Sequence, residues 1–138
     1  MKASKFIRDN GIQAAAKVIN SAPGNAESYW GGYYFREKPD FQFHNGIHEY
    51  WNLTENNGEY FKKRGFEPVI IKDLKRLVES VDYLNEWYSG KIDDAYDHVE
   101  RMYGMLKLRP QFPNLHDRIK LVEGHLSNYE SIYGVSHA

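Results

Sequence analysis

The spacing of apolar residues divides the chain into a helical start, a strand-rich middle and a helical second half. Within residues 1–22, apolar residues recur near helical spacing, namely Phe6, Ile7, Ile12, Ala15, Ala16 and Ile19. Asn10-Gly11 interrupts this pattern, and Pro23-Gly24 stops it. We therefore expect a first helix that is continuous or split at Asn10-Gly11. In the split form a reciprocal N-cap between Asn10 and Gln13 opens a second helix, from about Ile12 to Asn20.

Residues 28–66 change to short aromatic and β-branched runs separated by turn residues, a pattern typical of hairpins. The candidate strands are Tyr29–Trp30, Tyr33–Glu37, Phe41–His44, Ile47–Leu53 and Glu59–Lys63. Gly31-Gly32 is interpreted as a turn. Asn45-Gly46 predicts a tight hairpin, because both residue types tolerate the positive φ of a type I′ turn. We expect three or four of these pieces to be real strands of a small antiparallel sheet.

Residues 70–134 return to helical spacing and predict three amphipathic helices. The first runs from Ile70 to a stop at Gly90, and the second begins at Ile92 and ends before Pro110. The third has Asn114 as its cap and closes at Gly134. The expected fold class is α+β, with an N-terminal helix, a small antiparallel sheet of three to four strands and three C-terminal helices. A chain of 138 residues fits one domain, which we place over residues 1–138.

Composition restricts the classes of partner and the cellular location more than it restricts the activity. The net charge of −1 argues against wholesale binding to nucleic acid or anionic membranes. The chain contains no cysteine, which excludes disulfides, thiolate catalysis and cysteine-bound zinc. No apolar run approaches the roughly 18 residues of a membrane span, and no signal-peptide core follows the N-terminus. We expect a cytoplasmic protein with no membrane partner.

Aromatic residues make up 15% of the chain, and twelve of them lie between Tyr29 and Phe66. Many of these rings are expected to fill the core. A sheet covered by helices on one face has a second face, however, so we expect some rings to be exposed and to bind a partner protein. The proposed partner-binding residues are Tyr29, Trp30, Tyr33, Tyr34, Tyr50 and Trp51. The alternative is a single-stranded nucleic-acid binder, in which the same rings stack on bases and Lys62, Lys63 and Arg64 contact phosphates.

The remaining polar residues indicate no catalytic, cofactor-binding or metal-binding site. His44 and His48, with Glu49 nearby, lack the third ligand that a metal site requires. Asp93, Asp94, Asp97 and Glu100 complement the positive end of a helix dipole, although an acidic groove for a divalent metal or for a basic partner is the alternative. No serine lies in a nucleophile elbow, and no phosphate-binding glycine loop is present. We assign no catalytic, cofactor-binding or metal-binding residue, and a small enzyme of unrecognised type is the third alternative.

Two stretches carry a resemblance to a known group of proteins. Residues 6–19 (FIRDNGIQAAAKVI) and 71–80 (IKDLKRLVES) resemble segments of small accessory proteins of lambda-like phages and enterobacterial prophages. The resemblance implies a phage or prophage setting, a host or phage protein as partner, and no catalytic residues. We therefore expect a non-enzymatic interaction module. Self-association is left open, because the three C-terminal helices can complete their core by pairing with a second copy.

Overall fold

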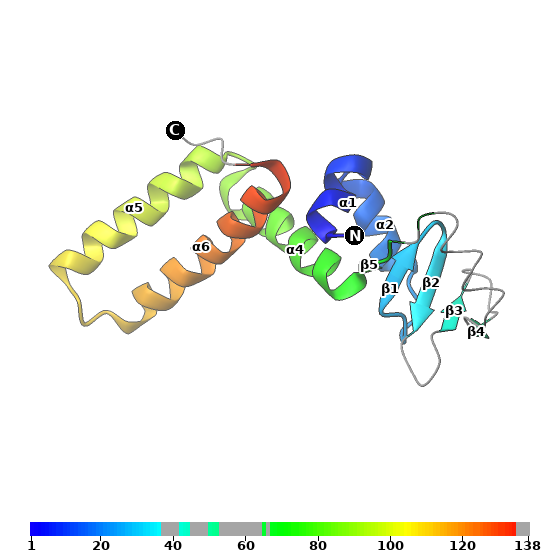
Figure 1. The fold of residues 1–138 in the computed structure, drawn as a ribbon. Coiled ribbons are helices and arrows are strands. Elements are labelled where there is room, and N and C mark those ends of the chain that lie inside the picture. The colour runs from blue at the N-terminus through cyan, green and yellow to red at the C-terminus, as the bar shows by residue number, and fades with distance from the viewer. Residues whose placement is uncertain (37–41, 45–49, 53–64, 66, 135–138) are drawn as a thin grey trace. The chain divides into compact units, whose positions relative to one another are not determined.

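The computed structural model describes residues 1–36, 42–44, 50–52, 65 and 67–134 (Figure 1). The helices are α1 (Ala3–Asn10), α2 (Ile12–Ser21), α4 (Ile71–Tyr88), α5 (Ile92–Leu108) and α6 (Pro113–Tyr133). The strands are β1 (Ser28–Trp30), β2 (Tyr33–Arg36), β3 (Gln42–His44), β4 (Tyr50–Asn52) and β5 (Val69–Ile70). This order of N-terminal helices, sheet and C-terminal helices confirms the α+β class.

The chain divides into two compact units, and the boundary between them falls inside α4. The first unit comprises residues 1–75, which include α1, α2, the five strands and the start of α4. The second unit comprises residues 76–138, which include the rest of α4, α5 and α6. Each unit is described below by itself.

The five strands of the first unit form one antiparallel sheet in the order β4-β3-β2-β1-β5. Its four strands between Ser28 and Asn52 confirm the three to four expected from the sequence. The sequence does not predict the two-residue strand β5, because Ile70 fits the helical spacing of the residues that follow it. β5 pairs with β1, which lies much earlier in the sequence, and Val69 is opposite Tyr29. The spacing of neighbouring residues does not indicate this pairing.

Each of the first three strands pairs with the next one along the chain. Trp30 lies opposite Tyr33 at the end of the β1–β2 pair, with φ of 56° at Gly31 and 90° at Gly32. Two central residues with positive φ are what a type I′ turn requires, so the Gly31-Gly32 turn is confirmed. β3 and β4 also pair, with His44 opposite Tyr50. That register leaves residues 45–49 between the paired positions, and the predicted Asn45-Gly46 turn lies outside the described residues.

Both faces of the sheet are covered at β1 and β2. Tyr34 lies opposite Tyr29, and Phe35 lies opposite Ser28, so these two pairs occupy opposite faces of the sheet. Tyr34 is 6% exposed, Phe35 is 0% exposed and Ser28 is also buried. The expectation that helices leave one whole face open is therefore wrong for these two strands.

The second unit is built on a helical hairpin, in which α5 and α6 lie side by side and α4 packs against them (Figure 1). Its apolar core comprises Leu84, Ala95, Val99, Met102, Ile119, Val122 and Leu126. These positions recur every three or four residues along their helices, as the sequence predicted. The expected Asn114 cap is wrong: α6 already begins at Pro113, and no side chain caps its N-terminus. Proline suits this first position because its missing N–H is not needed there.

None of the helices in the described part of the chain has the length and apolarity that crossing a membrane requires.

Candidate functional site

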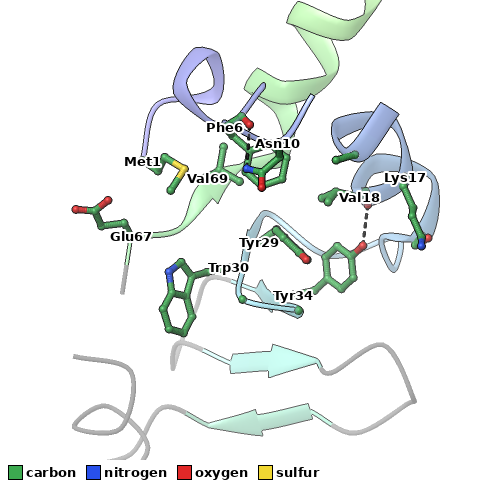
Figure 2. A pocket seen from close by; sticks show the side chains of 14 residues that line it. Met1, Phe6, Asn10, Lys17, Val18, Tyr29, Trp30, Tyr34, Glu67 and Val69 are labelled. Atoms are coloured by element: carbon green, nitrogen blue, oxygen red, sulfur yellow. Dashed lines mark hydrogen bonds between the residues drawn. The ribbon is translucent and has the colours of Figure 1, made fainter. Parts of the chain in front are cut away.

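The first unit contains a cleft of about 530 Å³ between its two N-terminal helices and the sheet (Figure 2). We call it the aromatic cleft. Its walls come from the N-terminus, α1, α2, the β1–β2 hairpin and the approach to β5. The residues that line it are Met1, Phe6, Asn10, Ala14, Lys17, Val18, Ser21, Tyr29, Trp30, Gly31, Gly32, Tyr34, Glu67 and Val69.

Three rings in contact form one side of the aromatic cleft. Tyr29 lies between the other two, with its ring centroid 6.0 Å from that of Phe6 and 5.1 Å from that of Tyr34. The Tyr34 hydroxyl donates a hydrogen bond of 2.8 Å to the Val18 carbonyl oxygen. Burial, and to a lesser extent the neighbouring Tyr29, raises the pKa of Tyr34. This hydroxyl therefore stays protonated and anchors α2 to the sheet.

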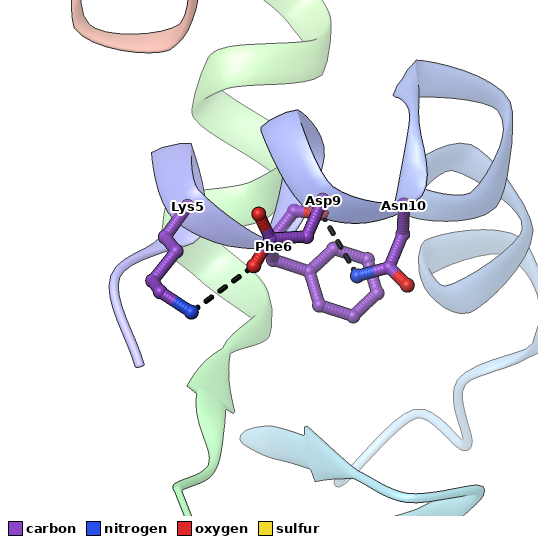
Figure 3. Close-up of polar contacts among 4 residues, drawn as sticks. All are labelled: Lys5, Phe6, Asp9 and Asn10. Atoms are coloured by element: carbon purple, nitrogen blue, oxygen red, sulfur yellow. Dashed lines mark hydrogen bonds and ion pairs between the residues drawn. The ribbon is translucent and has the colours of Figure 1, made fainter.

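The α1 wall depends on local polar contacts (Figure 3). The Asn10 side-chain N–H donates to the Phe6 carbonyl oxygen at 3.0 Å, while exposed Lys5 and Asp9 form an ion pair at 3.0 Å. The N-terminus of α2 has Gly11 at its cap position and no side-chain cap. The expected reciprocal cap between Asn10 and Gln13 is therefore wrong, because Asn10 bonds backwards to the end of α1.

The rim of the aromatic cleft carries two exposed charges of opposite sign. Figure 2 places Lys17 and Glu67 at opposite ends of it. Within the described part of the chain, neither side chain has an ion-pair partner. With Asn10 and Ser21, these groups offer hydrogen-bond donors and acceptors around an apolar floor. Such a combination suits a bound apolar group that is followed by polar backbone.

The structure brings three of the six proposed partner-binding residues together in the aromatic cleft, namely Tyr29, Trp30 and Tyr34. Tyr29 and Trp30 are half-buried, and Tyr33 is half-buried outside the lining. Tyr34 is a correction: its ring is buried and contributes to the floor, so it is no exposed docking residue.

The other residues proposed from the sequence are described less fully or not at all. Tyr50 and Trp51 belong to β4, and the structure describes their backbone only. Lys62, Lys63 and Arg64 lie outside the described residues, as do His48 and Glu49.

Sequence reasoning missed two kinds of residue. One is the helical side of the cleft, where Phe6, Lys17 and Val18 join the strand rings; only the amphipathic pattern of the N-terminal helices signals it. The other is exposed apolar surface on the C-terminal helices. The side chains there that are 44% to 84% exposed are Trp87, Tyr103, Met105, Leu108, Phe112, Leu121 and Tyr133.

Two histidines of the second unit connect helices. Ser80 Oγ and His125 Nδ1 lie 2.8 Å apart, and the Tyr88 hydroxyl lies 2.7 Å from His98 Nδ1. The side-chain N–H of Asn128 also donates to Ser80 Oγ, at 2.8 Å. Ser80 is 0% exposed and His125 is half-buried, so this serine–histidine contact packs α4 against α6.

Burial lowers the pKa of both histidines. For His98 the nearby Arg101 and Arg118 lower it further, whereas for His125 the nearby Glu79 acts in the opposite direction. Both imidazoles are therefore held in the neutral form near pH 7.

Within the described ranges, no group of three or more histidine and acidic side chains could hold a metal ion. Comparison with protein-family models, with curated proteins and with solved structures finds no match. The resemblance to phage accessory proteins therefore stays a prediction.

Proposed function

We propose that this chain is a non-enzymatic interaction module, an accessory protein of phage or prophage type that binds a host or phage protein. The aromatic cleft is the observation that supports it, because Tyr29 and Trp30 both line it and Tyr29 lies against Phe6. Tyrosine and tryptophan provide much of the binding energy at protein interfaces, since they bury large areas at low cost in side-chain entropy. The proposed binding surface is thus a cleft and not an open sheet face.

The lining of the cleft favours a protein segment as ligand. Its floor is aromatic and aliphatic and can take one apolar side chain of the partner. Asn10 and Ser21 can hydrogen-bond to the backbone on either side of that side chain. With Lys17 at one end and Glu67 at the other, a segment with an acidic residue towards Lys17 and a basic residue towards Glu67 binds in one preferred direction.

Affinity capture from enterobacterial lysates tests this proposal with four matched baits. The wild type and Lys72→Ala, a control at an exposed position of α4 outside the cleft, should capture the same dominant protein. Trp30→Ala removes a ring from the lining, and Ala14→Trp fills the cleft from α2. Both variants should lose that protein while keeping the circular dichroism spectrum of the wild type.

Titration calorimetry with the purified partner then measures the effect. We expect Trp30→Ala to weaken binding by about 2 kcal/mol, or roughly thirtyfold. Equal affinity of all four baits would contradict the proposal, as would the absence of any specific partner under several lysate conditions.

Labelled single-stranded DNA and RNA, titrated at two salt concentrations, provide the counter-test. Phosphate contacts make affinity fall steeply with salt, because condensed counterions are released on binding. Micromolar binding with such a salt dependence would contradict the protein-binding proposal in favour of the nucleic-acid alternative.

A further inference from the structure

The turn between α5 and α6 exposes a cluster of large apolar side chains. We call residues 105–121 the hairpin tip. Exposed fractions there are 84% for Leu108, 56% for Met105, 46% for Phe112 and 45% for Leu121. Met105, Phe112 and Leu121 also line a groove of about 590 Å³, together with Arg118. Apolar side chains that gather in one place on a surface, beside a groove, indicate a binding site for another molecule.

The hairpin tip is also strongly basic in a chain of net charge −1. It contains Lys107, Arg109, Arg118 and Lys120 against the single acidic residue Asp117, a net charge of +3, so the rest of the chain carries −4. Two of these cations lie against rings: the Arg109 guanidinium carbon is 5.9 Å from the Phe112 centroid, and that of Arg118 is 4.8 Å from the Trp87 centroid. The apolar and the basic side chains therefore belong to one surface.

Helix stability accounts for Lys107, which lies in the last turn of α5, but not for the cations of α6. A helix is stabilised by acidic side chains in its first turn and by basic ones in its last turn, yet α6 has neither. Arg118 and Lys120 lie beyond the first turn of α6, which begins at Pro113, and the effect of the helix dipole falls off within that first turn. The helix dipole therefore does not explain these two cations of α6, whereas attraction to an acidic surface would account for their placement.

The chain itself carries an acidic surface at the other end of the same hairpin. Asp93, Asp94, Asp97 and Glu100 occupy the first turns of α5. Within the described residues, Asp94, Asp97 and Glu100 have no ion-pair partner. The end of α6 lies beside this acidic start, because the Tyr96 hydroxyl donates a hydrogen bond to Glu130. The end of α6 also contributes the half-exposed ring of Tyr133 to this acidic surface.

On α5, acidic and apolar residues share one solvent-facing stripe. Asp94, Asp97, Arg101, Met105 and Leu108 recur at intervals of three and four, and all are exposed. Residues at this spacing lie one above another on a helix. The stripe runs from acidic at the start of α5 to apolar and basic at the hairpin tip.

We propose that two copies of this chain pair through their α5–α6 hairpins in antiparallel orientation, with the tip of each against the acidic start of α5 in the other. A two-fold axis makes this contact twice. The parallel arrangement would instead bring the two basic tips together and the two acidic ends together. Antiparallel pairing buries Met105 and Leu108 between the hairpins and gives the packing of a four-helix bundle.

Light scattering after size exclusion tests the pairing directly. The wild type should have twice the mass of the 16.2 kDa chain, and raising the salt should weaken the dimer. Reversing two charges at the tip (Lys107→Glu with Arg109→Glu), or two at the start of α5 (Asp94→Lys with Asp97→Lys), should each raise the dissociation constant about tenfold or more. Mixing the two reversed variants should restore a dimer, now of one copy of each.

A matched control reverses Lys72 and Lys75, which are exposed on α4, and should leave the dimer intact. Leu108→Asp should give a folded monomer, because this side chain is 84% exposed and contributes little to the fold of the single chain. A wild type that stays monomeric at high micromolar concentration would overturn the proposal. So would a dimer that keeps its affinity in both charge-reversed variants, or reversed variants that do not associate when mixed.

Discussion

At the residue scale, one hydroxyl group connects a helix to the sheet. Tyr34 is 6% exposed, and its hydroxyl donates a hydrogen bond to the Val18 carbonyl oxygen in the last turn of α2. Removing the partner of a buried carbonyl costs more than the bond itself contributes, because the carbonyl cannot regain its bond to water. The floor of the aromatic cleft therefore depends on a side chain that the density of rings in the sequence had placed among the partner-binding residues.

We predict that Tyr34→Phe lowers the free energy of unfolding by about 1 kcal/mol. Urea denaturation followed by circular dichroism measures this change. Tyr29→Phe is the matched control, since Tyr29 contacts the same rings and the described residues contain no hydrogen-bond partner for its hydroxyl. The control should stay within about 0.5 kcal/mol of wild type. Equal stability of the two variants would show that the Tyr34–Val18 hydrogen bond contributes nothing.

His98 and His125 make stability depend on pH. Burial lowers the pKa of each below its usual 6.5, so near and below that pH the folded chain binds fewer protons than the unfolded chain. The contribution of the two neutral imidazoles is thus complete above pH 6.5 and is lost as the pH falls below it. We predict a lower free energy of unfolding at pH 5.5 than at pH 7.5, measured with urea.

The double variant His98→Asn with His125→Gln should lose most of this pH dependence. His116→Gln, at an exposed position of α6, should keep it. A double variant whose stability changes with pH as strongly as that of wild type would assign the effect to other groups.

At the element scale, the sequence predicts best what depends on neighbouring residues. Helix α4 follows the expected stripe closely, because Leu74, Leu77, Val81 and Leu84 are all buried. The Gly31-Gly32 turn was also predictable, since it needs residue types that accept positive φ. Strand β5 was not predictable, because Val69 and Ile70 continue the apolar pattern of α4 but pair with a strand some forty residues earlier.

The β1–β2 turn yields a prediction of its own. Gly32→Ala should lower the free energy of unfolding by about 1 kcal/mol, because alanine is strained at the φ of 90° found there. A Cβ at this position meets no atom within 4 Å, so the cost comes from the backbone alone. Gly31→Asn should stay within about 0.5 kcal/mol, since asparagine tolerates the φ of 56° at that position. Thermal unfolding of both variants distinguishes them; a destabilised Gly31→Asn with an unaffected Gly32→Ala would contradict the assigned turn.

At the scale of the whole molecule, each unit has a groove that is lined by partly exposed apolar side chains. The first unit has the aromatic cleft around Tyr29 and Trp30, and the second has the hairpin tip around Leu108 and Phe112. The sequence indicated the first through its density of rings. It gave no sign of the second, because exposure of Leu108 depends on where α5 ends and what packs beside it.

The residues of the candidate site were only partly predictable from the sequence. Strand periodicity places Tyr29 and Trp30 on a sheet, but it contains no information on which helix covers Tyr34 or brings Phe6 and Lys17 beside them. These contacts join residues that are distant in sequence, and tertiary packing alone determines them.

The most direct test of the account is photocrosslinking from inside the aromatic cleft in enterobacterial cells. Benzoylphenylalanine replaces Trp30 in one variant and the exposed α4 residue Lys72 in another. We predict that irradiation links the Trp30 position to one partner protein, that filling the cleft with Ala14→Trp abolishes this product, and that the Lys72 position does not form it. No crosslinked partner from Trp30, or the same products from both positions, would contradict a binding function for the cleft.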